Sequence, residues 1–289
     1  MMKHVSRRSF LKTSGAVAAA ACVVPKALSA EPLSVPLGLQ LYSVRNLLPK
    51  DFDGTLRQLA KFGYREVEAA GYFNKTAKEW KSSMDTAGLR CVSTHHPLAD
   101  LKAKLNELIE YGNAIGLQYM ICSWVGMHRD PANKNKDLSL DDWRWAADQF
   151  NEIGAKVKAA GMQFGYHNHT IEFGSENGVV FYDELLKRTD PKMVVMEMDC
   201  GWVVAGGANP VHYLSQDPQR FPMLHVKDLV KQPDGKWKNV VMGRGTIDYH
   251  PIFKAATGLK HSFIEQEEFT GDPLSELHED AEFMQNFRV

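Results

Sequence analysis

The stretch that decides the fold runs from residue 143 to residue 169, as "WRWAADQFNEIGAKVKAAG" (143–161) followed by "MQFGYHNH" (162–169). The first part spaces its apolar residues three and four apart, as an amphipathic helix does, and ends in glycine, a common helix stop. The second part is a short apolar run that ends in polar residues, which is typical of a buried strand. The stretch therefore predicts a helix that leads directly into a strand.

The same alternation repeats along the chain, and segments 53–63 and 101–116 also end in or beside glycine before an apolar run. The predicted strands are "LGLQLYSV" (37–44), "REVEAAG" (65–71), "LRCVSTHH" (89–96), "QYMICSWV" (118–125), "MQFGYHNH" (162–169), "MVVMEMD" (193–199), "FPMLHVKD" (221–228) and "HSFIEQEE" (261–268). Eight such units, with no GxGxxG after the first strand, favour an α/β fold of the (β/α)8 TIM-barrel type in a single domain. Segment 225–251, with its "PDGK" turn, predicts a hairpin or loop at the barrel mouth.

The N-terminus has a different character. "SRRSFLK" (6–12) precedes an apolar, alanine-rich run and the small-residue site "PKALSA", which together indicate a twin-arginine export signal. We expect a signal peptide over 1–30, a barrel domain over 31–289, and a periplasmic or secreted protein. Lipoprotein anchoring at Cys22 is a weaker alternative, because Ala19 stands where such sites carry a bulky aliphatic residue.

The composition excludes some classes of function. The chain has 289 residues, a formal net charge of -1 and 44% hydrophobic residues, as an ordinary globular protein does. The body lacks the basic block expected of a nucleic-acid binder, which argues against a barrel nuclease. No internal apolar run is long enough to span a bilayer. The composition is also compatible with a homo-oligomer.

Polar residues gather at the ends of the predicted strands, where TIM barrels carry their chemistry. Among them, Asp199, His225 and Glu265 each follow an apolar run at a comparable depth. Carboxylates and imidazoles without thiolates suit a divalent metal rather than a structural zinc. We expect these three residues to hold Mn2+, with Zn2+, Co2+ or Fe2+ as alternatives.

Five motifs in order carry a family resemblance: "GYHNHTIEF" (165–173), "MEMDCGWVVAGGANP" (196–210), "RFPMLHVKD" (220–228), "GRGTIDY" (243–249) and "FIEQEE" (263–268). Together they resemble the xylose isomerase-like TIM-barrel family, the sugar phosphate isomerase/epimerase group, which is similar to inosose dehydratases and ketose 3-epimerases. The resemblance implies a divalent metal held by Glu, Asp, His and a second Glu from strands five to eight. Asp199, His225 and Glu265 match the last three of these ligands.

The fifth strand departs from the family pattern, because "YHNH" stands where ketose epimerases carry a glutamate. His167 and His169 share one face of the strand and Asn168 lies on the other. With the histidines inward, His169 would be the fourth metal ligand and either histidine could act as a base, which is our preferred interpretation. With Asn168 inward, the histidines would be buried against the helices, and Glu197 or Glu172 could replace the missing ligand.

These parts support proton abstraction next to the carbonyl of a sugar or keto-sugar. The metal would polarise the carbonyl and stabilise the enediolate, and His167, His169 or Glu265 would move the proton. Reprotonation would make the protein an isomerase or epimerase, which is the expected activity. Loss of a β-leaving group would instead make it a dehydratase or eliminase, or a hydrolase of 3-keto-glycosides. A non-catalytic carbohydrate-binding barrel is the alternative from another class.

Further residues are predicted to contact the substrate or the ligands. They are Gln40, Glu68, His95, Trp124, Asn168, Trp202 and Lys227. Lys227 would hold an anionic oxygen, and the two tryptophans would form an apolar wall for a sugar ring. Core packing explains a tryptophan, and a surface position explains a lysine, equally well.

Overall fold

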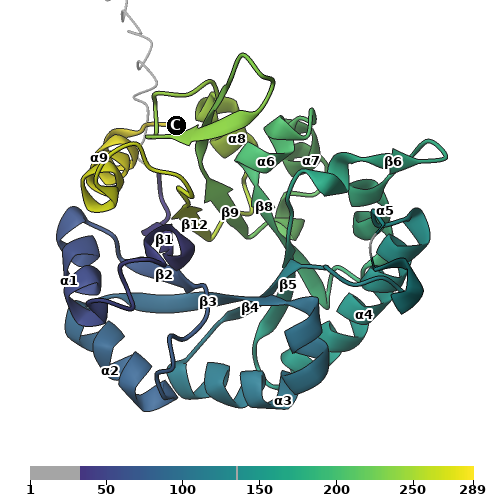
Figure 1. The fold of residues 1–289 in the computed structure, drawn as a ribbon, viewed down its shortest axis with the longest axis horizontal. Helices are drawn as coiled ribbons and strands as arrows, with labels where there is room; N and C mark the ends of the chain where they lie inside the picture. The colour runs from purple at the N-terminus through teal and green to yellow at the C-terminus, as the bar shows by residue number, and fades with distance from the viewer. Residues whose placement is uncertain (1–32, 135) are drawn as a thin grey trace, which may run out of the picture. The chain divides into compact units, whose positions relative to one another are not determined.

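Eight parallel strands close into a barrel in the order β1-β12-β9-β8-β5-β4-β3-β2 (Figure 1). The computed structural model describes residues 33–134 and 136–289, so the predicted signal peptide, its boundary at residue 30 and Cys22 lie outside the described residues. The barrel strands are β1 (Leu37–Gln40), β2 (Glu66–Ala69), β3 (Arg90–Pro97), β4 (Tyr119–Trp124), β5 (Gln163–His167), β8 (Val194–Asp199), β9 (Met223–Val226) and β12 (His261–Ile264). The predicted (β/α)8 TIM barrel is confirmed.

Helices surround the barrel (Figure 1). They are α1 (Phe52–Phe62), α2 (Ala77–Ala87), α3 (Leu98–Ile115), α4 (Leu140–Ala159), α5 (Phe181–Arg188), α6 (Cys200–Ala205), α7 (Pro210–Gln216), α8 (Tyr249–Ala255) and α9 (Pro273–Asn286), with 3-10 turns η1 (Leu41–Val44), η2 (Pro131–Asn133), η3 (Ile171–Phe173) and η4 (Pro218–Arg220). Thr76 and Ser139 begin α2 and α4 with capping boxes, and Gly63 and Gly116 end α1 and α3 in the left-handed conformation. Among the described residues, no helix combines the length and apolarity needed to cross a membrane.

The first and last predicted strands end well before the sequence pattern suggests. The first stops at Gln40, because the Gln40 side chain accepts a hydrogen bond from the backbone N–H of Tyr42 at 3.0 Å and caps η1. The last stops at Ile264, which leaves Glu265 and Glu267 just beyond the strand. Both differences move polar residues from the strands into the loops at the barrel mouth.

Short hairpins extend the loops. The predicted hairpin in 225–251 is confirmed as the antiparallel pair β10 (Asp228–Lys231) and β11 (Trp237–Val240). A second pair, β6 (Ser175–Glu176) and β7 (Val179–Val180), follows β5 and was not expected from the sequence.

The register of β5 settles which face of that strand is inward. His167 pairs with Glu197 of β8, and its Nδ1 lies 3.3 Å from Glu197 Oε2 inside the barrel. Tyr166 points the other way and stacks on Phe150 of α4, with ring centroids 4.9 Å apart. The interpretation with the histidines inward therefore holds for His167, while His169 lies two residues beyond the strand end.

An apolar layer fills the barrel one step below the mouth. It consists of Val92, Tyr119, Ile121, Val195, Met223 and Phe263, which form a buried cluster of their own. Below it, Glu66 of β2 pairs with His261 of β12 at 2.7 Å and with Arg90 of β3. The interior is therefore closed from below, and ligands can reach it only from the mouth.

Gly38 gives this layer the space it needs. A Cβ at Gly38 would lie 2.5 Å from Phe263 Cδ1 and 2.6 Å from the carbonyl oxygen of Ser262. We predict that Gly38→Ala lowers the free energy of unfolding by about 1–3 kcal/mol, because the backbone of β12 cannot give way as a flexible side chain can. Urea denaturation of the variant measures the change.

Gly112→Ala is the matched control. Gly112 is a buried glycine in α3, and a Cβ there would meet only the side-chain ends of Leu117 and Met162, at 3.1 Å. We expect it to change stability by less than about 1 kcal/mol, because alanine also favours the helix. Equal losses in the two variants would contradict the packing argument for Gly38.

Candidate metal centre and pocket

Four buried side chains meet at the C-terminal ends of neighbouring strands. His167, Asp199, His225 and Glu265 each offer one ligand atom, and these atoms all lie within 4.8 Å of one another. His225 Nδ1 lies 3.1 Å from Glu265 Oε2 and 3.9 Å from Asp199 Oδ2. Two imidazoles and two carboxylates form a donor set that suits a divalent transition metal.

Asn168 fixes the position of Asp199. Its Oδ1 accepts a hydrogen bond from the Asp199 backbone N–H at 3.1 Å, and its Nδ2 donates to the Asp199 carbonyl oxygen at 3.3 Å. The Asp199 side chain in turn accepts the backbone N–H of Trp202 at 2.8 Å and caps α6. Asn168 thus links the end of β5 to the end of β8 and orients Asp199, a candidate metal ligand.

Glu172 does not join the ligands. Its carboxylate accepts hydrogen bonds from the Tyr166 hydroxyl, on the helix side of β5, and from the backbone N–H of His169 at 2.9 Å. Burial raises the pKa of Glu172 to about 7. Glu172 therefore shapes the loop that carries His169.

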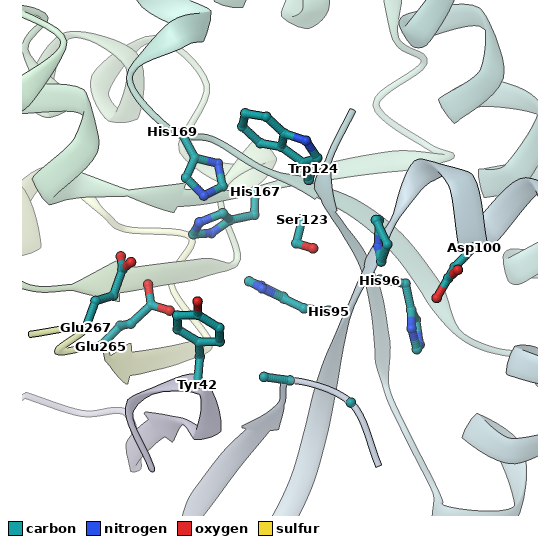
Figure 2. Close-up of a pocket in the computed structure, with 13 residues that line it drawn as sticks. Tyr42, His95, His96, Asp100, Ser123, Trp124, His167, His169, Glu265 and Glu267 are labelled. Atoms are coloured by element: carbon teal, nitrogen blue, oxygen red, sulfur yellow. The ribbon is translucent and has the colours of Figure 1, made fainter. Parts of the chain in front are cut away.

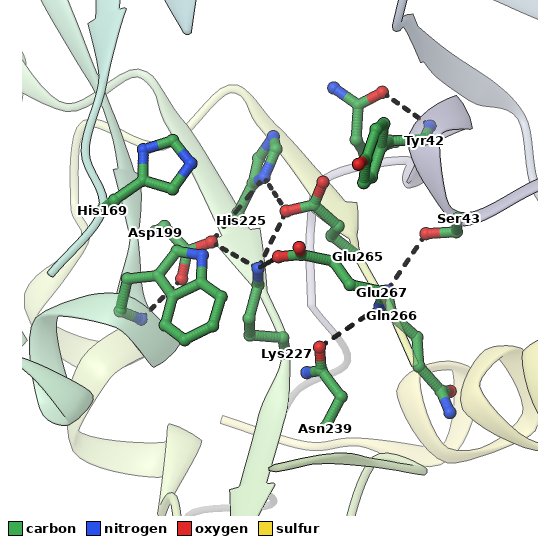
Figure 3. Close-up of polar contacts among 12 residues, drawn as sticks. Tyr42, Ser43, His169, Asp199, His225, Lys227, Asn239, Glu265, Gln266 and Glu267 are labelled. Atoms are coloured by element: carbon green, nitrogen blue, oxygen red, sulfur yellow. Dashed lines mark hydrogen bonds and ion pairs between the residues drawn. The ribbon is translucent and has the colours of Figure 1, made fainter. Parts of the chain in front are cut away.

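Lys227 is buried among three carboxylates (Figure 3). Its Nζ lies 2.9 Å from Asp199 Oδ2, 2.9 Å from Glu265 Oε2 and 2.6 Å from Glu267 Oε1. Burial alone would lower the pKa of Lys227, but these carboxylates raise it above its ordinary value. Gly201 leaves the space for its stem, since a Cβ there would lie 2.3 Å from Lys227 Cγ. Lys227 is therefore charged and holds two of the four ligands.

A second group lies deeper and shares two members with the first. It comprises His95, His167, Glu197 and His225. His95 Nε2 lies 2.6 Å from Glu197 Oε2 and 2.8 Å from Glu68 Oε1, and His225 Nε2 lies 2.8 Å from the same Glu68 oxygen. Gln40 Nε2 donates to that oxygen at 2.6 Å. Glu68 is therefore surrounded by donors, while Glu197 Oε1 has no hydrogen-bond partner in the described part of the chain.

The charges of the two groups differ. Burial alone would lower the pKa of His95, but Glu68 and Glu197 raise it to about 10; the carboxylates likewise raise the pKa of His225. Without a metal, the protonated His95 and His225 thus balance Glu68 and Glu197; to act as a ligand, His225 would release the proton on its ligating nitrogen. Around Lys227, in contrast, Asp199, Glu265 and Glu267 exceed the cationic charge, and burial raises the pKa of Asp199 to about 6. The excess of negative charge beside Asp199 and Glu265 favours a cation there.

A pocket of about 420 Å³ opens above these groups (Figure 2). Glu265 and His167 reach its wall, so a ligand in the pocket can contact the candidate metal centre directly. His169 also lines it, with its ring centroid 5.4 Å from that of Trp124, and its Nδ1 has no hydrogen-bond partner among residues 33–134 and 136–289. Burial lowers the pKa of His169 to about 4, so its imidazole is neutral.

The structure brings some predicted site residues to the pocket and buries others. His95, Trp124, His167, His169 and Glu265 line the pocket. Gln40, Glu68, Asn168, His225 and Lys227 are buried, and Trp202 packs its ring 4.4 Å from Lys227 Nζ. His167, and not His169, belongs to the group of ligand atoms with Asp199, His225 and Glu265.

Ser123 and Asp100 are among the pocket residues that were not selected from the sequence. Ser123 lines the pocket two residues after the inward-facing Ile121 of β4, so strand alternation could have found it. Asp100 lies in the first turn of α3, where an acidic residue has an ordinary capping role and gives no distinct signal.

The chain is similar to known proteins both in its N-terminal signal and in its barrel. Residues 4–23 match the signal sequence of the twin-arginine translocation pathway, which confirms the predicted export route. An inosose dehydratase from Clostridium botulinum (strain Alaska E43 / Type E3) is 24% identical over 233 residues, which cover 70% of this chain and 76% of the relative. A crystal structure of a sugar phosphate isomerase/epimerase from Parabacteroides distasonis is 28% identical, with a TM-score of 0.71, over 87% of this chain and 93% of that one.

A crystal structure of the IOLI protein with a bound zinc atom shares the fold alone, at 12% identity and a TM-score of 0.69, over 86% of this chain and 96% of that one. The family described as xylose isomerase-like TIM barrel matches residues 56–287, which is most of the barrel. The chain therefore belongs to the xylose isomerase-like TIM-barrel family.

Proposed function

We propose that this protein is a divalent-metal-dependent enzyme that removes a proton next to the carbonyl of a keto-sugar and then eliminates a β-leaving group, as a dehydratase does. The observation that carries the proposal is the group His167, Asp199, His225 and Glu265, which opens into the pocket through His167 and Glu265. A buried set of donors at the floor of a polar pocket is a strong indication of an active site.

The four residues fit a metal by their chemistry and by their charge. Each can present one ligand atom to a common point, and the carboxylates around Lys227 carry more negative charge than this ammonium group balances. When bound there, Mn2+, or Zn2+, Co2+ or Fe2+ as alternatives, would polarise the substrate carbonyl and stabilise the developing enolate. The IOLI structure, which shares this fold, contains a bound zinc atom, and this supports a metal in the proposed enzyme.

Two residues of the pocket wall can move protons. His169 is neutral, and its unpartnered Nδ1 is free to accept a proton from a bound sugar. Glu265 is held by Lys227 and His225, which lower its pKa against the effect of burial and keep it ionised. We assign His169 as the base and His167 as the fourth metal ligand. The sequence interpretation had instead made His169 the ligand.

The outcome after proton removal separates two activities. The curated inosose dehydratases support elimination, as does the histidine on β5 where ketose epimerases carry a carboxylate. The Parabacteroides relative, named a sugar phosphate isomerase/epimerase, supports reprotonation as the second candidate. Both activities begin with the same proton abstraction.

The metal can be tested directly. We predict that the purified exported protein carries about one divalent cation per chain and that Asp199→Asn and Glu265→Gln each lose most of it, because each removes an anionic ligand. Elemental analysis by mass spectrometry after dialysis measures the content.

Asp280→Asn serves as the control. Asp280 is a buried carboxylate of α9 that accepts the Met242 backbone N–H at 2.7 Å, and it belongs to neither ligand group. It should keep its metal. If the ligand variants fold and retain as much metal as the control, the proposed centre is wrong.

Proton abstraction has its own test. We predict that the metal-loaded protein, incubated with keto-sugars in D2O, exchanges deuterium at the carbon next to the carbonyl and releases an unsaturated product. His169→Ala should slow the exchange by about 10²–10⁴-fold, the usual contribution of a general base, while metal content stays unchanged. NMR follows both exchange and elimination.

His212→Ala, at an exposed histidine of α7, should exchange at the wild-type rate. Exchange without an unsaturated product would favour the isomerase or epimerase. If none of the keto-sugars exchanges deuterium although metal is present, the enzyme hypothesis is rejected in favour of the carbohydrate-binding barrel.

A further inference from the structure

We propose that the pocket binds an uncharged glycoside of two linked units. The carbonyl-bearing ring lies against Glu265 and His169, and the second unit occupies the part of the pocket formed by Gly71, His96, Pro97 and Asp100, which we call the outer subsite. The place of the first ring rests on the proposed function, whereas the outer subsite is argued from its own residues.

The pocket extends well beyond the candidate metal centre. Figure 2 shows His96 and Asp100 on one side of His95, with Glu265 and Glu267 on the other. The outer subsite comes from the β2–α2 loop and from the junction of β3 and α3, whereas three of the four candidate ligands come from β8, β9 and β12. A single ring bound at the metal would therefore leave the outer subsite unfilled.

Two exposed aromatic rings line this pocket. Among the described residues, the exposed large hydrophobic side chains are Tyr42, Trp124, Ile171 and Val289, so half of them lie here. Exposed aromatic rings at a pocket are a common signature of ligand binding, and the C–H face of a sugar ring packs well on them. The two rings therefore offer apolar contacts for a ligand larger than one ring.

Both rings are held in place without a ligand. The Arg45 guanidinium lies 4.1 Å from the centre of the Tyr42 ring and donates hydrogen bonds to the carbonyl oxygens of Tyr42 and Glu267. Trp124 packs edge-on to His169 and over Gly126, where a Cβ would lie 2.5 Å from the indole. Such preorganisation reduces the entropy that binding a ligand costs.

The charges of the pocket disfavour a phosphorylated sugar. No lysine or arginine lines it among the described residues, while Asp100, Glu265 and Glu267 do. Phosphate is normally bound by arginine or lysine, or by a helix N-terminus. The α3 N-terminus lies at the outer subsite, but Asp100 in its first turn would repel a phosphate, and Lys104 pairs with Asp100 at 3.1 Å. Sugar hydroxyl groups, in contrast, can donate to the Asp100 carboxylate.

Calorimetry with the metal-loaded exported protein tests the inference. The probes are glucose, glucose 6-phosphate, and the disaccharides cellobiose, maltose and trehalose. We expect at least one disaccharide to bind about tenfold or more tightly than glucose, and glucose 6-phosphate to bind no more tightly than glucose. Asp100→Asn should weaken the disaccharide by about tenfold and change glucose by less than about twofold. Trp124→Ala, which removes the ring beside His169, should weaken both ligands, and Trp124→Tyr should restore most of the loss.

Three results would overturn the outer subsite: disaccharides that bind no better than glucose, tightest binding of glucose 6-phosphate, or an Asp100→Asn variant that weakens glucose and disaccharide equally while remaining folded by circular dichroism. Deuterium exchange keeps this inference separable from the proposed function. If disaccharides bind selectively but keto-sugars show no deuterium exchange, the outer subsite stands and the proposed enzyme activity is rejected. If deuterium exchanges but disaccharides do not bind selectively, the enzyme activity stands and the outer subsite is rejected.

Discussion

The buried ammonium group of Lys227 is the interaction on which the mouth of this barrel depends. Three carboxylates from the ends of β8 and β12 lie within 2.9 Å of its Nζ, and without it they would repel one another at the floor of the pocket. Lys227 removes only part of that negative charge. The remaining negative charge favours a cation at the proposed metal centre, where Asp199 and Glu265 point at a common space.

The residues below and above Lys227 fix the positions of the charged side chains. The apolar layer that contains Ile121 and Phe263 fills the barrel below them, so the strand ends cannot move into the interior. The hydrogen bond from the Asp199 backbone N–H to Asn168 fixes Asp199 relative to β5. Glu68, which also contacts His95, binds the opposite ring nitrogen of His225. Of the four candidate ligands, only Glu265 and His167 line the pocket above. A substrate would therefore contact the proposed metal centre from that side, while Asp199 and His225 stay shielded from solvent.

Much of this arrangement could be predicted from the sequence, because strand and helix periodicity repeat clearly and the polar strand ends mark the mouth. Alternation could show that His167 and Asn168 face opposite ways, but not which faces inward, since that depends on the register with β8. The partnership of Lys227 with Glu267 depends on loops after β9 and β12, and Asp100 reaches the pocket from α3. Such contacts join residues far apart in the chain and leave no local pattern.

Crystallography of the manganese-loaded protein, with diffraction data collected at the manganese absorption edge, tests the central claim most directly. The account predicts one strong anomalous peak about 2.0–2.3 Å from one atom each of His167, Asp199, His225 and Glu265. A peak between His95 and Glu197 instead, with Lys227 still alone between Asp199 and Glu265, would contradict it, as would manganese bound only at the surface.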